Sequence, residues 1–188
     1  FNNLVDQLKI KATASYYYND QQVEKDNILF PAGSNAFYPI GTFPNEPLFP
    51  NGMIGNPEFR EEQARFNIDT EYNGIDKHII RVGAGFFWGD IYETKEQKNF
   101  LFAPRPGGLE EVADTDEVFL PEKHRTNTSL YVQDEWLFAD NWAFTSGIRY
   151  DDYSDFGDTV NPRLALVWAT TDSITTKLLY GRAFRAPT

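Results

Sequence analysis

The chain has 188 residues, of which 28 are acidic and 17 are basic, and its formal net charge is −11. This acidic balance argues against a nucleic-acid partner, which would require basic patches on the protein. Cysteine is absent, which excludes disulfide frameworks, cysteine-based zinc sites and thiol nucleophiles. No apolar run approaches the roughly 18 residues of a membrane-spanning helix.

Seven segments of the chain alternate between apolar and polar residues. In chain order they cover residues 8–18, 62–72, 78–92, 126–138, 142–152, 160–169 and 174–182. Alternation of this kind indicates half-buried antiparallel strands, and the regular turns between the segments indicate a meander. Each segment is near or above the roughly 9–11 residues that a tilted strand needs to cross a bilayer.

The even-numbered positions form the apolar face in every segment, and the aromatic residues on this face fall into two groups by height. One group lies near one rim of the predicted sheet: Tyr16, Tyr18, Trp88, Tyr92, Tyr150 and Tyr180. The other lies near the opposite rim: Tyr72, Trp136, Phe138, Trp142 and Trp168. Aromatic girdles at both interfaces are typical of a transmembrane β-barrel, and a soluble sandwich has no reason to sort aromatics by depth. Asp134 and His78 share the apolar parity, but both lie near strand ends.

The connections between the segments alternate between short and long. Residues 73–77, 139–141 and 170–173 form tight turns, whereas 19–61 and 93–125 are long. Bacterial barrels have short periplasmic turns and long extracellular loops. The sequence therefore predicts an all-β, antiparallel up-and-down meander of about seven strands, a segment of a transmembrane β-barrel whose two long loops are extracellular.

Four motifs carry a family resemblance. YVQDEW at 131–136, GIRYDDYSDFG at 147–157, NPRLAL at 161–166 and YGRAFRAPT at 180–188 resemble barrel motifs of TonB-dependent outer-membrane receptors, in that family's order and strand spacing. The resemblance implies a barrel of about 22 strands with a plug domain, which imports scarce nutrients with energy passed from the inner membrane. Because 188 residues supply fewer strands and no signal peptide is recognisable, we expect an internal segment, with the plug and the remaining strands outside it.

The first long loop is rich in aromatic residues and poor in charge. Its candidate ligand-binding residues are Phe30, Phe37, Tyr38, Phe43 and Phe49. Loops of this length are usually functional or disordered. Aromatic rings at an outer mouth suit a flat ligand such as a catecholate siderophore or haem; the alternative is that they form the loop's own hydrophobic cluster.

The polar face of the predicted sheet carries several arginines. We add Arg81, Arg149 and Arg163 to the ligand-binding set, together with Arg105 from the second long loop. The planar guanidinium of arginine bonds carboxylates bidentately, which suits an anionic ligand. The alternative is that these charges pair with the barrel wall itself.

No catalytic arrangement is present in the sequence. His78 and His124 are far apart, and neither belongs to a metal-ligand pattern such as HExxH. We therefore expect no enzymatic activity, no cofactor and no metal site. The acidic stretch GLEEVADTDE at 108–117 contains oxygen ligands of the kind that calcium takes, but its spacing matches no EF-hand, which favours a solvated loop.

Three glycines, at positions 83, 85 and 89, lie close together in the third segment. Glycine in a strand interior often marks a close approach of another part of the structure. We expect these glycines to leave room for a plug or loop, with packing among lumen side chains as the alternative.

Taken together, the sequence predicts part of an outer-membrane active transporter of a Gram-negative bacterium. Its expected partners are a ferric siderophore or similar ligand, TonB acting through the plug, and the outer-membrane lipid. A haem or vitamin B12-like receptor of the same family is the alternative ligand class. A passive porin or structural barrel and a soluble carbohydrate-binding sandwich are the rival protein classes.

Overall fold

The computed structural model describes residues 7–34, 48–100 and 108–184, and every element named within them is a β-strand. These residues contain no helix with the length and apolar character needed to traverse a bilayer. The chain forms two compact units. The sheet unit comprises residues 1–16, 63–89 and 125–188, and the loop unit comprises residues 17–62 and 90–124.

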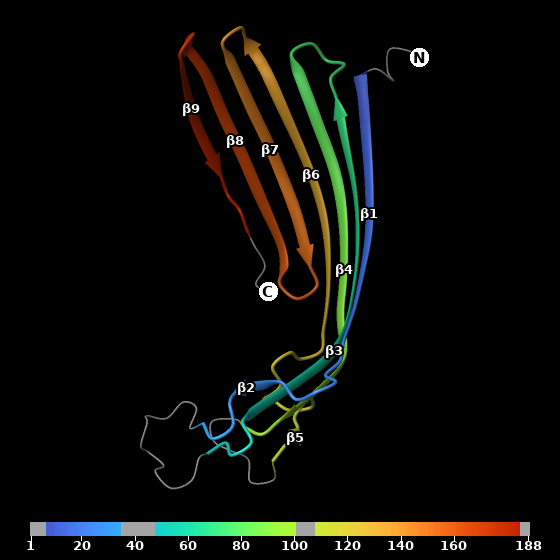
Figure 1. The fold of residues 1–188 in the computed structure, drawn as a ribbon. Helices are drawn as coiled ribbons and strands as arrows, with labels where there is room; N and C mark the ends of the chain where they lie inside the picture. Colours follow the sequence, from blue (N-terminus) through green and yellow to red (C-terminus); the bar gives the residue numbers. More distant parts are fainter. Residues whose placement is uncertain (1–6, 35–47, 101–107, 185–188) are drawn as a thin grey trace. The chain divides into compact units, whose positions relative to one another are not determined.

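Seven long strands follow one another in the order β1-β3-β4-β6-β7-β8-β9, so each lies beside its neighbour in the meander (Figure 1). Their bounds are β1 Leu8–Gln21, β3 Met53–Tyr72, β4 His78–Lys98, β6 Lys123–Ala139, β7 Trp142–Tyr153, β8 Gly157–Thr171 and β9 Ile174–Gly181. Two short strands lie off this path: β2 Ile28–Phe30 pairs with β3, and β5 Glu110–Glu111 pairs with β4. The predicted all-β antiparallel meander is therefore confirmed.

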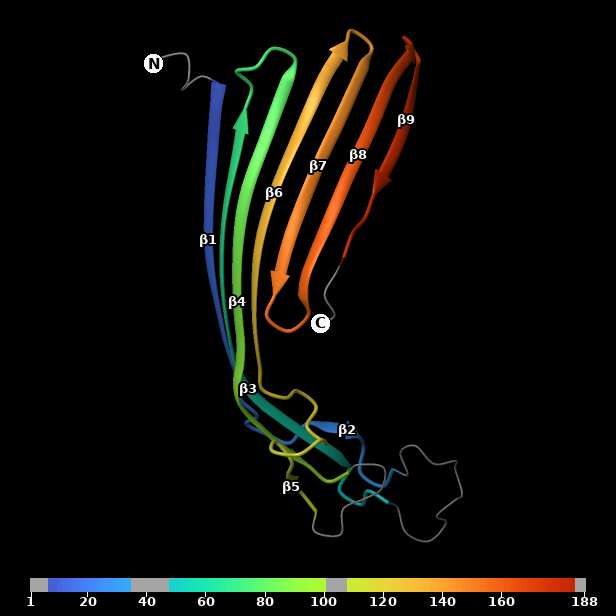
Figure 2. The ribbon, with the colours of Figure 1, turned by 180° about the vertical axis from the view of Figure 1, so that it is seen from behind.

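Figure 2 shows the turns β3–β4, β6–β7 and β8–β9 together at one end of the sheet unit, and the β7–β8 turn, residues 154–156, at the other end. All seven predicted segments are strands, six of them are longer than predicted, and β3 and β4 extend furthest beyond the predicted bounds. Strand β3 begins at Met53 rather than near residue 62, and β4 continues to Lys98 rather than ending near residue 92. Parts of both predicted long loops are therefore strand.

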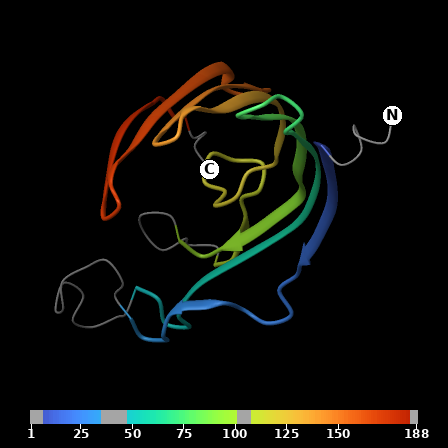
Figure 3. The same ribbon diagram turned by 90° about the horizontal axis from the view of Figure 1, so that it is seen from above.

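The register of strands β6 to β9 keeps even residues opposite even residues, except at the pairs Ala139–Trp142 and Thr171–Ile174 beside two turns. Strands β6 to β9 succeed one another along a curved sheet (Figure 3). Val132 faces Ile148 across β6–β7, and Leu164 faces Tyr180 across β8–β9. Because Cα partners in an antiparallel pair point their side chains to the same face, one apolar and one polar face run through these strands, as the alternation predicts.

The apolar face carries a continuous run of rings at the end with the turns β3–β4, β6–β7 and β8–β9. His78 stacks on Trp136 with ring centroids 5.5 Å apart, and Trp142 stacks on Trp168 at 5.1 Å. Phe138 joins the two pairs, with centroids 5.3 Å from Trp136 and 6.0 Å from Trp142. Four of the five aromatics predicted for this rim thus form one band, on strands β6, β7 and β8.

Asp134 and His78, the two polar residues on the apolar parity, contact each other. Nδ1 of His78 lies 2.8 Å from Oδ2 of Asp134. A polar pair on an apolar surface is less costly when its members bond each other. The two apparent exceptions to the alternation therefore pair with one another beside the aromatic band, while Oδ1 of Asp134 has no hydrogen-bond partner among the described residues.

The loop unit has a small hydrophobic core of its own. Phe49 and Met53 are 3% and 2% exposed, and Phe100 packs against them. Asn99 ties this core to the start of β3, because its amide donates to the Gly52 carbonyl at 2.8 Å and accepts from the Ile54 N–H at 2.8 Å.

The acidic stretch 108–117 is folded against β4. Glu96 and Lys98 are both buried and lie 3.1 Å apart as an ion pair. Glu96 accepts a hydrogen bond from the Phe119 N–H at 2.5 Å, and Lys98 donates to the Glu117 carbonyl. Because a buried charge is tolerated only when it is paired and hydrogen-bonded, these contacts fix the loop's path over Val112, which is 2% exposed.

Candidate functional site

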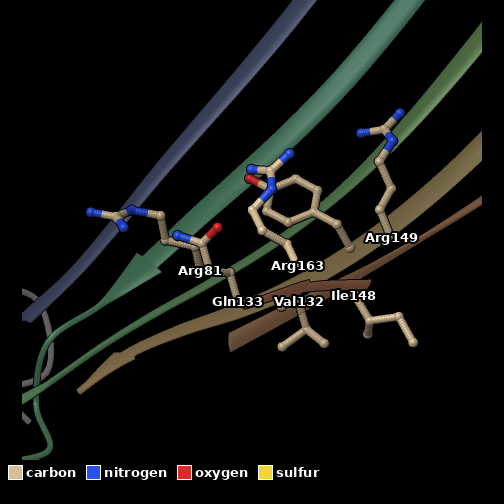
Figure 4. Close-up of a pocket in the computed structure, with 8 residues that line it drawn as sticks. Arg81, Val132, Gln133, Ile148, Arg149 and Arg163 are labelled. Carbon is tan, nitrogen blue, oxygen red and sulfur yellow. The ribbon is translucent and has the colours of Figure 1, made fainter. Parts of the chain in front are cut away.

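Three of the predicted ligand-binding arginines lie together on the polar face of the sheet unit. Arg81 of β4, Arg149 of β7 and Arg163 of β8 line a hollow of about 300 Å³, which we call the first hollow. Its other lining residues are Tyr131, Val132, Gln133, Gly147 and Ile148. Figure 4 shows the three arginines and Gln133 on one side of the strands, and the side chains of Val132 and Ile148 on the other.

Register explains why these residues converge. Gly147 faces Gln133 on one side and Arg163 on the other, and Arg149 faces Tyr131. A Cβ atom at Gly147 would lie 3.2 Å from the Cβ of Gln133, which is tighter than ordinary van der Waals contact. The missing side chain therefore leaves open space between Gln133 and Arg163.

Arg81 is held by carboxylates of the neighbouring strands β3 and β6. Its Nε donates to Glu71 at 3.0 Å and its Nη1 donates to Glu135 at 3.3 Å. Glu71 also accepts from Lys9 at 3.0 Å. Since these groups are partly exposed, each pair contributes little to stability, but together they fix the position of the Arg81 guanidinium at the hollow.

Arg149 and Arg163 differ in what they contact. Arg149 forms a two-pronged bond with Asp151, at 2.9 Å from Nε and 2.7 Å from Nη2. Asp151 is 5% exposed, and this bond supplies the partner that a buried carboxylate requires. Within the part of the chain that the structure describes, Arg163 has no carboxylate within ion-pair distance. Its guanidinium is therefore the donor most accessible to a ligand in the first hollow.

Tyr131 and Gln133 complete the first hollow, although sequence reasoning did not select them. Both occupy odd positions of β6 opposite the β7 residues that line the hollow. Tyr131 donates to Oδ1 of Asp69 at 2.8 Å, so its hydroxyl is engaged with the wall. The sequence does contain a signal for them, because odd-numbered residues share the polar face and the register places these two opposite Gly147 and Arg149.

The glycines of β4 accommodate side chains of the wall itself. A Cβ at Gly83 would lie 2.7 Å from Cζ of Tyr131, and one at Gly85 would lie 2.7 Å from Oγ of Ser129. Real Cβ atoms essentially never come this close to another atom. The structure thus favours the second of the two interpretations of these glycines, packing among side chains of the polar face.

The aromatic residues predicted to bind ligand from the first long loop are only partly described. Phe30 lies in β2 and is 40% exposed, whereas Phe49 lies in the core of the loop unit. The burial of Phe49 is the arrangement expected if the aromatics form the loop's own cluster. Phe37, Tyr38, Phe43 and Arg105 lie outside the described residues.

Charged side chains of the loop unit form a small network around Arg60. Its Nε donates to Asp20 at 3.2 Å, and its Nη1 donates to Glu93. Desolvation alone would raise the pKa of the Asp20 carboxyl, but hydrogen bonds from Arg60 and Gln22 outweigh it and hold that pKa below its usual value. Hydrogen bonds to Asp20 and Glu93 in turn raise the pKa of Arg60. Asp20 and Arg60 lie outside the predicted spans 8–18 and 62–72.

Metal ligands do not gather in this part of the molecule. Over residues 7–34, 48–100 and 108–184, no three or more histidine, aspartate or glutamate side chains are arranged to hold a metal ion. Within the acidic stretch, Oε1 of Glu111 accepts from the N–H groups of Glu96 and Ala113, at 2.7 and 3.1 Å. This carboxylate therefore supports the backbone of the loop.

Comparison with known proteins identifies a family. A family model described as TonB dependent receptor-like, beta-barrel matches residues 1–188. No curated protein and no solved structure matches the chain.

Proposed function

Because the chain belongs to the TonB-dependent receptor-like β-barrel family, we propose that it forms part of an active transporter that imports a scarce ligand, most often a ferric siderophore. The family is one of outer-membrane transport proteins of Gram-negative bacteria rather than of enzymes. In this proposal the seven long strands are a segment of a wider barrel, residues 19–61 and 93–125 lie in extracellular loops, and the plug and remaining strands are supplied by the rest of the receptor.

The first hollow is the observation that carries the ligand proposal. In a membrane barrel the polar face lines the lumen and the apolar face contacts lipid. Arg81, Arg149 and Arg163 therefore present guanidinium groups to the inside of the barrel. Ferric siderophores carry carboxylate, catecholate or hydroxamate oxygens, and planar guanidinium groups bond such oxygens in pairs.

The aromatic band supports the membrane partner. The rings of Trp136, Phe138, Trp142 and Trp168 lie together at the end of the sheet unit that carries the three turns β3–β4, β6–β7 and β8–β9. Trp rings prefer the membrane–water interface, and short turns are typical of the periplasmic side. We place this band at the periplasmic boundary of the outer membrane, with TonB acting from the same side through the plug.

Uptake by the full-length receptor tests the transport proposal. Cells that depend on the receptor should accumulate radiolabelled iron from the cognate ferric siderophore only when TonB is present. A passive porin would instead admit its solute equally well without TonB, and a haem or vitamin B12-like receptor would support growth on those nutrients. TonB-independent uptake would overturn the proposal of active import.

The matched variants Arg163→Gln and Lys177→Gln test the role of the first hollow. Both remove one positive charge from the polar face, but only Arg163 lines the hollow. Losing a charge-assisted hydrogen bond costs about 1.5–3 kcal/mol, so Arg163→Gln should weaken siderophore binding about tenfold or more. Equal affinity in the two variants would show that the hollow does not contact the ligand.

A further inference from the structure

A second arginine-lined hollow of about 300 Å³ lies on the same polar face of the sheet unit. Arg65 of β3, Arg125 of β6 and Arg149 of β7 line it, and Arg149 thus lines both hollows. The remaining lining residues are Asn67, Gly85, Phe86, Phe87, Asn127, Ser129 and Tyr153. None of the residues lining the second hollow is a carboxylate, but Arg125 and Arg149 pair with Asp155 and Asp151 beside it, so Arg65 supplies its uncompensated positive charge among the described residues.

The two hollows follow one another along the strands. The first hollow lies at the level of Gly147 and its partner Arg163, whereas the second reaches the level of Tyr153 and its partner Asn127. Tyr153 lies six positions after Gly147 on β7, and an extended strand rises about 3.3 Å per residue. The second hollow therefore extends toward the end of the sheet unit that carries the β7–β8 turn.

Arg65 is the most available donor of the second hollow. Its guanidinium lies over the Phe87 ring, 5.1 Å from the centroid. Among the described residues it has no carboxylate within ion-pair distance. Arg125, in contrast, bonds Asp155 at 2.8 Å and lies 5.0 Å from the Phe156 centroid. The ring beneath Arg65 fixes its direction without neutralising its charge.

Polar side-chain atoms beside this hollow are buried without a hydrogen-bond partner. Nδ2 of Asn127, Oγ1 of Thr159 and Oδ1 of Asn161 all share this condition. Asn127 lines the second hollow, and the register places Thr159 opposite Asp151 and Asn161 opposite Arg149. Of these three atoms, only Nδ2 of Asn127 is an unused donor on a residue that lines the second hollow, because Thr159 and Asn161 do not line it and Oδ1 of Asn161 is an acceptor.

Polar side chains occupy the floor of the second hollow above Gly85. A Cβ at Gly85 would lie 2.7 Å from Oγ of Ser129 and 2.8 Å from Oδ1 of Asn67. Glycine at this position lets both polar side chains approach β4 from either side. The hollow therefore combines a polar floor with cationic walls.

We propose that the second hollow is a binding site for a small dissolved oxyanion, a carboxylate or phosphate, separate from the first hollow. Arg65, Arg149 and the amide of Asn127 supply the donors, and Arg149 can serve either hollow. Guanidinium and amide N–H groups converging on one space match the acceptor oxygens of such an anion. Because binding requires no transport, the proposal stands independently of the imported ligand.

Calorimetric titration of the detergent-solubilised full-length receptor with inorganic phosphate tests the site. The wild type should bind phosphate saturably, and tetramethylammonium chloride, a cation probe, should give no heat of binding. Arg65→Gln should weaken phosphate binding about tenfold, because it removes one charge-assisted hydrogen bond. Lys177→Gln, which removes a charge of the same sign outside both hollows, should leave the affinity unchanged.

Two further variants locate the bound anion. Arg163→Gln alters only the first hollow and should leave phosphate binding intact, whereas Arg149→Gln should weaken it. Heat-modifiable migration on gels checks that each variant barrel is folded, and Arg65→Lys keeps the charge if Arg65→Gln fails to fold. The proposal is overturned if the wild type binds no phosphate, if Arg65→Gln and Lys177→Gln bind it equally, or if Arg163→Gln alone weakens it.

Discussion

Replacing Gly83 by alanine should destabilise the barrel by about 2–3 kcal/mol, although it adds a single methyl group. The new Cβ would lie 2.7 Å from Cζ of Tyr131 and 2.9 Å from Oδ1 of Asp69. Tyr131 must then leave its place over β4 and lose its 2.8 Å hydrogen bond to Asp69. A hydrogen bond to a charged group contributes about 1.5–3 kcal/mol to stability, and we take the lower value because the Tyr131–Asp69 pair is only half-buried. An off-rotamer side chain adds about 0.5–1.5 kcal/mol.

A double-mutant cycle isolates this contact. Tyr131→Phe should cost only the hydrogen bond, about 1.5 kcal/mol. In a Tyr131→Ala background, Gly83→Ala should become neutral or slightly stabilising, since alanine lowers the entropy of the unfolded chain by up to about 1 kcal/mol. The coupling energy between the two positions should therefore be about 2 kcal/mol.

Urea unfolding of the full-length receptor in lipid vesicles, followed by tryptophan fluorescence, measures these free energies. Gly147→Ala is a useful comparison, because its Cβ would lie at 3.2 Å from its nearest neighbours and should cost less. If Gly83→Ala is as stable as the wild type, or if its penalty persists without the Tyr131 ring, the contact is not what selects glycine at this position.

Three further predictions concern the loop unit, the loop aromatics and the chain as a whole. Arg60→Gln should lower the thermal stability at pH 7, and this difference from the wild type should shrink in acid. The stability that comes from the lowered pKa of Asp20 is present above the ordinary value of 3.8 and is lost as the pH falls through the lowered pKa. A stability difference that is unchanged in acid would contradict this. The triple variant Phe37→Ser, Tyr38→Ser and Phe43→Ser should weaken siderophore binding more than the control Phe119→Ser, which changes a side chain of the other long loop that is 78% exposed. Equal siderophore affinity of the two variants would assign the loop aromatics a structural role. Residues 1–188 alone should not be a monomer in plain buffer. Leu178 and Leu179 of β9 have exposed fractions of 71% and 69%, and the outer edges of β1 and β9 are unpaired among the described strands. A monodisperse monomer by light scattering would refute this.

Local pattern was sufficient to predict the strands of the sheet unit but not their extensions. Alternation is a local property, and it held from 126 to 182, where short turns join paired strands. The early start of β3 depends instead on tertiary contacts: Met53 and Ile54 are buried, and Ile54 pairs with Ile28 of β2. The sequence there contains Gly55 and Pro57, which lower strand propensity. Pairing with a distant segment therefore outweighed the local signal.

The charges of the second long loop illustrate the same limit. A stretch with several carboxylates is ordinarily solvated, and Asp114 and Asp116 are indeed exposed. Glu96 and Lys98, however, lie in β4 and are buried as a pair that anchors this stretch. Nothing in their spacing distinguishes them from the exposed charges around them, because burial is decided by the chain that folds over them.

The arginine hollows, in contrast, follow from information that the sequence contains. Parity determines which residues share the polar face, and the turn centres determine which of them meet. Partners in the β6–β7 hairpin lie at equal distances along the chain from residue 140, so Tyr131 faces Arg149. Partners in the β7–β8 hairpin lie at equal distances from residue 155, so Gly147 faces Arg163. Both centres lie in turns that the sequence marks with Asn, Asp and Ser. The convergence of Arg149 and Arg163 around Gly147 is thus a consequence of two short turns, and a shift of either turn by one residue would move one arginine to the lipid face.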